Sequence, residues 1–228
     1  RRASPDFPEA CVELESLRRP LSVLFRAMGG ASGVGVEAAS ARDLILRRNL
    51  LQQVAGTCKQ LPVAWCDASN LRLPQSLAVY PQVALNQDLY RWLALLAAQA
   101  GEMRHWARDN QRWTQSILQR FPAMRPRYER LVEAHLLLRP DPDSLPRDEA
   151  ALERALRQAL CEPGSVELFP RSEVAPWPLP MWLYPAENLG VPQATELADE
   201  DPDHKLQAPP TERKGIRKRA KRVEDSTS

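Results

Sequence analysis

The sequence predicts a mainly α-helical protein: a helical bundle with a small β-hairpin, followed by a proline-rich extended strap and a disordered charged tail. Three observations predict this fold class. Apolar residues recur every three or four positions through most of the chain before Pro163. Residues 84–98, ALNQDLYRWLALLAA, are apolar on almost every side, and ten of the 21 prolines fall between Pro163 and Pro210. The expected units are the helical N-terminal domain, the Pro/Trp-rich strap and the acidic-then-basic tail, at residues 1–165, 166–194 and 195–228.

The helix over residues 84–98 is the expected centre of the domain. Asn86 at its entry is predicted to accept hydrogen bonds from the free N–H groups of the first turn, and Asp88 suits the positive end of the helix dipole. The stretch is too short and too charged at its edges to cross a bilayer, and no apolar run approaches ~20 residues. We therefore expect a helix that is buried by other helices, and no membrane insertion.

Two helices are expected before this one. The first helical stretch covers residues 17–28. Within this stretch a short break is expected, after which Pro20 opens a second helix, and the pair Gly29-Gly30 ends that helix. The glycine-containing stretch at residues 29–35 lacks the Gly-Lys-Ser/Thr ending of a phosphate loop and follows a helix, so it is interpreted as a connector. The other helix is expected over residues 41–55, with Gly56 stopping it.

A β-hairpin is predicted at residues 61–74. Apolar residues there alternate with period two on either side of the turn-prone sequence at 67–70.

Three more helices are expected after residue 100. The stripe over residues 103–121 and the helix opened by Pro126 are joined by a short proline-rich turn, which predicts an antiparallel helical hairpin. Asn110 lies inside the apolar stripe, where a buried amide needs partners and can fix the helix register. Ser144 is the expected cap of the last helix, which ends before Pro163-Gly164.

The segment Trp177–Pro185, WPLPMWLYP, is too apolar for an ordinary linker. Proline pre-sets an extended backbone, and two tryptophans offer a large area to bury. The hypothesis is a strap lying on the helical body. The alternative is a docking segment for a partner.

Charge is concentrated in the tail. The formal net charge is +2, but residues 213–222 carry seven Lys/Arg and no acid, so the rest of the chain sums to −5. This distribution argues against a globular nucleic-acid-binding face and leaves only the tail for phosphate binding. Four separated cysteines with no C-x-x-C pair and no secretory leader indicate a reducing, cytoplasmic compartment, where each cysteine is expected to be a small buried residue: Cys11, Cys58, Cys66 and Cys161.

No arrangement of residues predicts catalysis, so we assign no catalytic, cofactor-binding or metal-binding residue and expect no cofactor. The histidines His105, His135 and His204 are too scattered for a metal site, and His135 on an apolar face is expected to be a hydrogen-bonded core residue. The acidic stretch around His204 is interpreted as solvated. Nucleophile-elbow, dinucleotide-binding and P-loop motifs are absent from the sequence. The candidate contact surface is the basic helix face of Arg42, Arg47 and Arg48, with ordinary solvation as the alternative.

Five segments in order resemble the N-terminal region of NorD-type proteins, the nitric oxide reductase activation proteins, to which the CbbO proteins associated with Rubisco activation are similar. The resemblance covers most of positions 9 to 222. The segments are LSVLFRAMGG (21–30), LPVAWCDASNLRLP (61–74), ALNQDLYRWLALLAA (84–98), RDNQRWTQSILQRFPAMRPRYERLVEAHL (108–136) and WPLPMWLYP (177–185).

The resemblance implies a helical N-terminal domain, a variable charged linker and a C-terminal von Willebrand factor A domain. A basic stretch similar to RKRAKRVE leads toward that last domain in the family, and we expect the domain to be missing here. The ending Asp225–Ser228 is one residue short of a metal-binding Asp-x-Ser-x-Ser loop.

The resemblance further implies an adaptor, not an enzyme. Its partners would be a MoxR-type AAA+ ATPase, NorQ-like or CbbQ-like, and a target that is either nitric oxide reductase, whose activation is thought to include fitting its non-haem iron, or Rubisco. A different class of function, nucleic-acid binding through the basic tail, remains as an alternative, although that tail has no aromatic residues to stack bases.

Overall fold

The computed structural model describes residues 6–39, 63–67 and 69–186, and these form α-helices and two small sheets. The helices are α1 (Leu14–Ala27), α3 (Val83–Gln99), α4 (Trp106–Arg120), α5 (Arg125–Leu138) and α6 (Arg147–Cys161). The strands are β1 (Val12–Glu13), β2 (Gly35–Ala38), β3 (Trp65–Cys66), β4 (Asn70–Leu73) and β5 (Ser76–Leu77). Short 3-10 turns lie at Pro8–Ala10, Pro122–Met124 and Pro142–Ser144. The helix expected over residues 41–55 and the charged tail lie outside the described residues.

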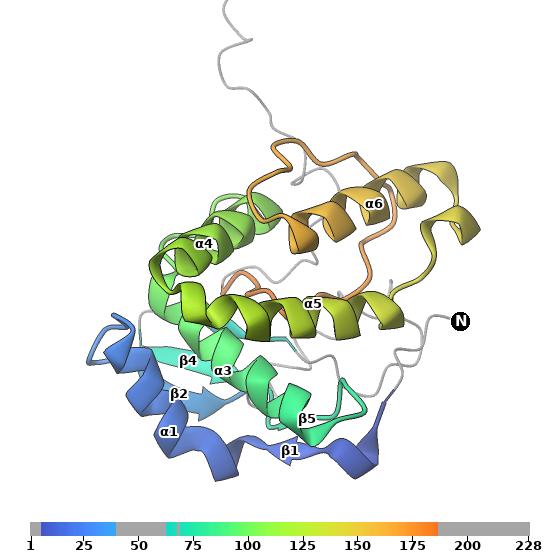
Figure 1. Cartoon of the computed structure of the whole chain (residues 1–228). Helices are drawn as coiled ribbons and strands as arrows, with labels where there is room; N and C mark the ends of the chain where they lie inside the picture. Colours follow the sequence, from blue (N-terminus) through green and yellow to red (C-terminus); the bar gives the residue numbers. More distant parts are fainter. Residues whose placement is uncertain (1–5, 40–62, 68, 187–228) are drawn as a thin grey trace, which may run out of the picture.

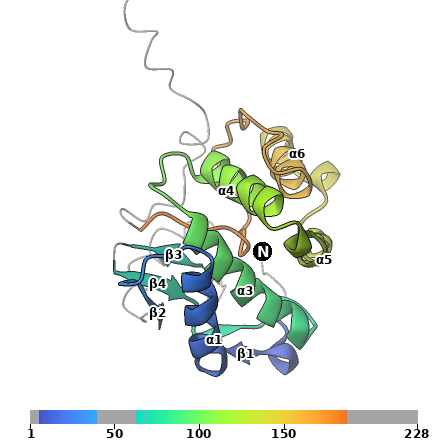
Figure 2. The same cartoon turned by 60° about the vertical axis from the view of Figure 1, so that its left-hand side comes forward.

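Helix α3 is the centre of the domain, as predicted. Helix α1 and the sheets lie on one side of it, and α4, α5 and α6 lie on the other (Figure 1, Figure 2). The apolar residues that leave α3 without a polar face are fully or almost fully buried: Leu89, Tyr90, Trp92, Leu93, Leu95 and Leu96. Neither α3 nor another helix in the described ranges is long and apolar enough to cross a membrane.

The predicted roles of Asn86 and Asp88 at the entry of α3 are wrong. The helix begins at Val83, so Asn86 falls inside it, and its buried amide accepts from the Tyr80 N–H at 3.0 Å and donates to the carbonyls of Ala10 and Tyr80 at 2.9 Å each. Asp88 lies beyond the first turn and pairs with two arginines. Tertiary partners that are distant in sequence therefore override local capping.

The break predicted at Pro20 is also absent. Helix α1 runs through Pro20, which lies on the exposed face, while Leu14, Leu21 and Phe25 are buried on the opposite face. Burial of that face against α3 holds the helix together across the single hydrogen bond that proline removes. The helix ends as expected, with Gly29 at φ +102°.

The β-hairpin is confirmed, because β3 and β4 pair antiparallel with Trp65 opposite Arg72. An unpredicted strand, β2, joins this sheet in parallel with β4, which gives the order β2-β4-β3. Its sequence begins at Gly35, inside the stretch interpreted as a connector, and it pairs with residues 35 positions away. A four-residue strand set by such a distant partner leaves little local pattern.

Helices α4 and α5 follow one another through the predicted proline-rich turn, with Pro126 in the first turn of α5. Each of the two packs against α3 and α6, so the direct packing expected of a helical hairpin is not what holds them. Asp109 fixes the start of α4, because its carboxylate accepts from the N–H groups of Arg104 and His105 at 2.7 Å each. Ser144 does not cap α6, which begins after Pro146; its hydroxyl instead donates to the Asp141 carbonyl.

Candidate interaction surface

The strap, Trp177–Pro185, lies on the helical body as predicted, and three side chains of α3 and α4 hold its backbone. The indole N–H of Trp92 donates to the carbonyl of Met181, and that of Trp106 donates to the carbonyl of Leu183, both at 2.9 Å. These indoles are buried, so each hydrogen bond is formed away from water. The strap residues beneath them are also buried: Leu179, Met181, Trp182 and Leu183.

Asn110 also holds the strap, and its predicted burial with hydrogen-bond partners is confirmed. Its amide donates to the carbonyls of Trp106 at 2.8 Å and Leu183 at 2.9 Å, and its oxygen accepts from the Leu183 N–H at 2.8 Å. A fully buried amide with three hydrogen bonds fixes one register of the strap on α4.

The opposite edge of the strap pairs with Ala64, the residue before β3. The Tyr184 N–H donates to the Ala64 carbonyl at 2.8 Å, and Leu183 forms a parallel bridge with Ala64. The Trp182 ring stands edge-on to Trp106, with the ring centres 5.1 Å apart. The strap is therefore part of the core, between the helices and the sheet.

A buried ion pair connects the end of α5 with α6 and with the strap. The Arg139 guanidinium makes two bonds to the Glu153 carboxylate, at 2.7 and 2.6 Å, and donates to the Pro178 carbonyl at 3.2 Å. Arg157 also binds Glu153, at 3.1 Å. Two guanidinium groups thus neutralise one carboxylate whose side chain is 3% exposed.

His135 is buried beside this ion pair, as predicted for a core histidine. Its Nε2 lies 3.3 Å from Nη1 of Arg139, which can only donate, so Nε2 accepts and the ring proton is on Nδ1. Burial lowers the pKa of His135 well below its usual value, and the positive charges of Arg139 and Arg157 lower it further. His135 is therefore neutral and structural.

A narrow open pocket lies between α6 and residues 172–177. Its walls are mostly apolar, and Glu149 and Glu153 supply its carboxylates. Because Glu153 is already neutralised by arginine, the pocket offers no pair of free acid and base groups for catalysis.

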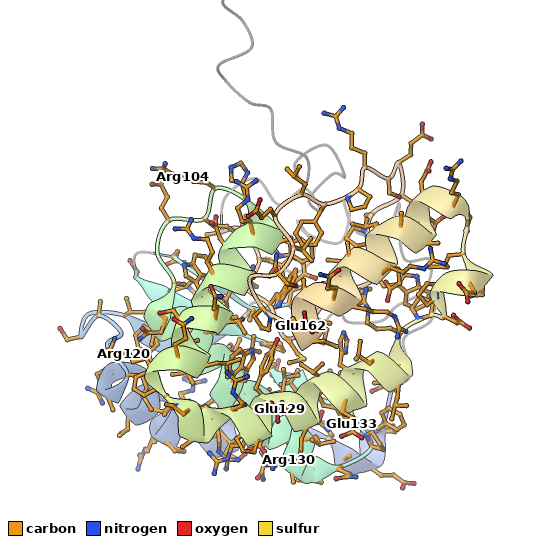
Figure 3. The ribbon with its side chains drawn as sticks, turned by 45° about the horizontal axis from the view of Figure 1, so that its top comes forward. Arg104, Arg120, Glu129, Arg130, Glu133 and Glu162 are labelled. Carbon is orange, nitrogen blue, oxygen red and sulfur yellow. The ribbon has the colours of Figure 1, made fainter. Side chains whose placement is uncertain are left out.

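Charged side chains gather on the outer side of α5, a surface that we call the α5 face (Figure 3). Cations lie toward the end of α4 and the start of α5, and acids lie farther along α5 and at the end of α6. The Tyr128 hydroxyl bonds the Leu160 carbonyl at 2.7 Å, which holds α6 against α5 here. The exposed residues of the α5 face are Arg120, Arg125, Arg127, Glu129, Arg130, Glu133 and Glu162.

The ion pairs on the α5 face are long and their arginines are exposed, although the Asp88 side chain is only 13% exposed. Arg125 lies 3.9 Å from Glu129, and Arg130 lies 3.6 Å from Asp88 of α3. Pairs of this kind are worth roughly 0–1 kcal/mol and leave the guanidinium groups available to a second protein. This surface was not predicted from the sequence, although four arginines lie between positions 120 and 130.

The other predicted functional residues are placed as follows. Arg42, Arg47 and Arg48, Cys58, the acidic stretch with His204 and the basic tail lie outside the described residues. His105 is at the start of α4 and His135 is in α5, and in the described ranges no three His, Cys, Asp or Glu side chains are grouped to hold a metal ion.

The expected burial of the cysteines is wrong for the three that the structure describes. Cys11 and Cys161 are exposed, and Cys66 is half-buried. Each follows or ends an element at the surface, where a small residue fits without being enclosed. Partial burial raises the pKa of all three thiols, and neighbouring carboxylates raise it further.

Comparison with known proteins identifies relatives. No protein-family model and no solved structure matches the chain. Protein NorD of Stutzerimonas stutzeri is 75% identical over all 228 residues, which cover 37% of that protein. Over its whole length the chain is thus similar to part of a NorD protein.

Two other relatives extend the match. An uncharacterized protein of Pseudomonas aeruginosa is 58% identical over the whole chain, again covering 37% of that protein. Protein NorD of Brucella abortus is 32% identical over 148 residues, which is 60% of this chain and 23% of that protein. The chain thus spans little more than a third of the curated NorD protein that it matches over its full length, and it corresponds to the N-terminal part. The resemblance to NorD proteins inferred from the sequence is confirmed.

Proposed function

We propose that this chain is the helical adaptor region of a NorD protein that acts with a MoxR-type AAA+ ATPase in the maturation of nitric oxide reductase. The observation that carries the proposal is the 75% identity to Protein NorD over the whole chain. The ATPase and the target enzyme are what the family resemblance implies. The relatives with assigned names are called NorD, which favours the nitric oxide reductase branch over the CbbO-like Rubisco branch.

In this role the ATPase supplies the energy of ATP hydrolysis, and the chain supplies a shaped surface in the cytoplasm without catalysing a reaction. Two features support the assignment. The buried groups Arg139 and Glu153, with the partly buried Arg157, are engaged in holding α5, α6 and the strap together. The exposed charged groups of the α5 face are weakly paired and suit contact with another protein.

Binding of purified components tests the proposal. The chain, the NorQ-like ATPase from the same organism and nitric oxide reductase are mixed in pairs and analysed by size-exclusion chromatography, and ATP turnover is measured with and without the chain. We expect co-elution with the ATPase or the target, or a change in turnover. A CbbQ-like ATPase with Rubisco is the matched control, and it should show neither effect.

Absence of co-elution and an unchanged turnover would refute the adaptor role for these residues. Preferential binding to the CbbQ-like ATPase would move the chain to the Rubisco branch. Because the chain spans 37% of Protein NorD, we expect it to bind without activating the reductase by itself. Deletion of residues 212–228 tests the nucleic-acid alternative. Under that alternative the deletion should abolish nucleic-acid binding, whereas binding to the ATPase through the helical body should be unchanged.

A further inference from the structure

We propose that the α5 face is the part of this domain that binds the partner protein, and that it recognises a carboxylate-rich surface on that partner. This inference rests on the proposed adaptor function and adds to it the location and the chemistry of the contact. The α5 face has four exposed arginines, Arg120, Arg125, Arg127 and Arg130. Between positions 120 and 130 the single acid is Glu129, which Figure 3 shows with Arg120 and Arg130.

Two of these arginines, Arg125 and Arg127, lie where they do not help the fold, whereas Arg120 donates to the Gln99 side-chain oxygen and Arg130 pairs with Asp88 of α3. The amino end of a helix carries partial positive charge and favours Asp or Glu, yet the first turn of α5 has no acid and holds Arg125 and Arg127. No side chain caps this helix end, and Arg127 forms no ion pair with another described residue. Arg125 has only the Glu129 carboxylate, 3.9 Å away, to compensate it, and the unpaired charge of Arg127 against the dipole is the kind of conflict that marks a binding surface.

The type of cation fits a protein partner. All 17 basic residues in the described ranges are arginine, and the five lysines of the chain lie elsewhere, at positions 59, 205, 214, 218 and 221. A guanidinium group binds a carboxylate through two parallel hydrogen bonds, and arginine is enriched in protein interfaces where lysine is depleted.

The distribution of charge favours an acidic protein over a nucleic acid. The described ranges contain 17 arginines and 19 Asp or Glu residues, which gives a net charge of −2. On the α5 face, Glu129, Glu133 and Glu162 lie beside the cations. Phosphate chains would be repelled by these acids, whereas a protein can place acids opposite the arginines and bases opposite the glutamates. The ring nearest the cations, Phe121, is half-buried with the Arg120 guanidinium 5.3 Å from its centre, so it is not open for base stacking.

Charge reversal in the full chain tests the surface. The variant R125E/R127E is compared with R19E/R26E, which makes the same change in net charge on exposed positions of α1, across α3 from α5 (Figure 2). Affinity for the ATPase and for nitric oxide reductase is measured by biolayer interferometry at low and high salt. We expect R125E/R127E to raise the Kd for one of them by about tenfold or more, and R19E/R26E to change it less than about twofold.

Folding and nucleic-acid controls complete the test. Circular dichroism and a melting temperature within about 3 °C of the wild type check that the variants fold, because the exposed Arg125–Glu129 pair adds little to stability. If the wild type binds a partner and R125E/R127E binds it equally well, this surface is wrong and the adaptor role stands. If the wild type binds neither protein, both proposals fail. A loss of affinity for duplex DNA in R125E/R127E, with protein binding unchanged, would also overturn the inference.

Discussion

Replacing Asn110 by alanine should loosen the strap. The substitution removes three buried hydrogen bonds, and it leaves the Leu183 N–H without its acceptor in a site closed to water. The Leu183 carbonyl keeps the Trp106 indole as a donor, so the main loss is one orphaned N–H and the packing of the amide. An unsatisfied buried donor costs about 1–3 kcal/mol, and with the lost packing we expect the free energy of unfolding to fall by about 2–4 kcal/mol.

Urea unfolding followed by tryptophan fluorescence measures this loss, and chymotrypsin cleavage within Trp177–Pro185 measures release of the strap. Gln119→Ala on the exposed side of α4 is the matched control, and it should change stability by less than about 0.5 kcal/mol. Asn110→Asp should be worse than alanine, because a carboxylate would face the two carbonyls to which the amide now donates. If Asn110→Ala unfolds within about 1 kcal/mol of the wild type and the strap is cleaved no faster, these hydrogen bonds do not hold the strap.

Three further predictions concern the core. Arg139→Met should lower the free energy of unfolding by about 3–5 kcal/mol in thermal or urea unfolding, because Glu153 stays buried without this partner. Adding Glu153→Leu should restore part of the loss, and equal stability of the single and double variants would contradict the prediction. The pKa of His135 is lower in the folded than in the unfolded protein, so the stability that this residue confers is present above about pH 6.5. That stability is lost as the pH falls toward the folded pKa, at up to about 1.4 kcal/mol per pH unit. In urea titrations between pH 7.5 and 5, His135→Leu should flatten this pH dependence, and an unchanged slope would refute the prediction. Gly30→Ala would drive a methyl group into the buried Phe25 ring and should lower the melting temperature, whereas Gly33→Ala meets nothing and should leave it unchanged.

The sequence predicted those parts of the fold that depend on local periodicity. The burial of α3 follows from a run of leucine, alanine and tryptophan without a polar face, and the β3–β4 hairpin follows from alternation around a turn. Two of the wrong predictions share one cause, which is a distant partner. Asn86 binds Ala10 and Tyr80 instead of its own helix end, and Pro20 stays inside α1 because its opposite face is buried on α3.

The candidate surface was predicted less well than the fold. The sequence predicted basic surfaces at Arg42, Arg47 and Arg48 and in the tail, where basic residues are close together in the sequence. The cations of the α5 face are divided between two helices by a proline-rich turn, and only the fold brings them together with Glu162 of α6. The pairing of Arg139 with Glu153 has the same origin, because their partnership spans two helices and 14 residues.

Proline explains why an extended segment can be buried at all. A buried strand without a sheet neighbour on each side needs partners for every N–H and carbonyl, and Pro178 and Pro180 remove two of those donors from the strap. The carbonyls that remain accept from side chains of the body: Pro178 from Arg139, Met181 from Trp92, and Leu183 from Trp106 and Asn110. Several of the remaining donors are also engaged, since the Leu179 N–H donates to the Tyr184 hydroxyl at 3.0 Å, the Trp182 N–H to the Leu179 carbonyl at 3.1 Å, and the Leu183 N–H to the Asn110 side-chain oxygen. The proline content that separates this segment from the helices in the sequence is therefore what allows it to enter the core.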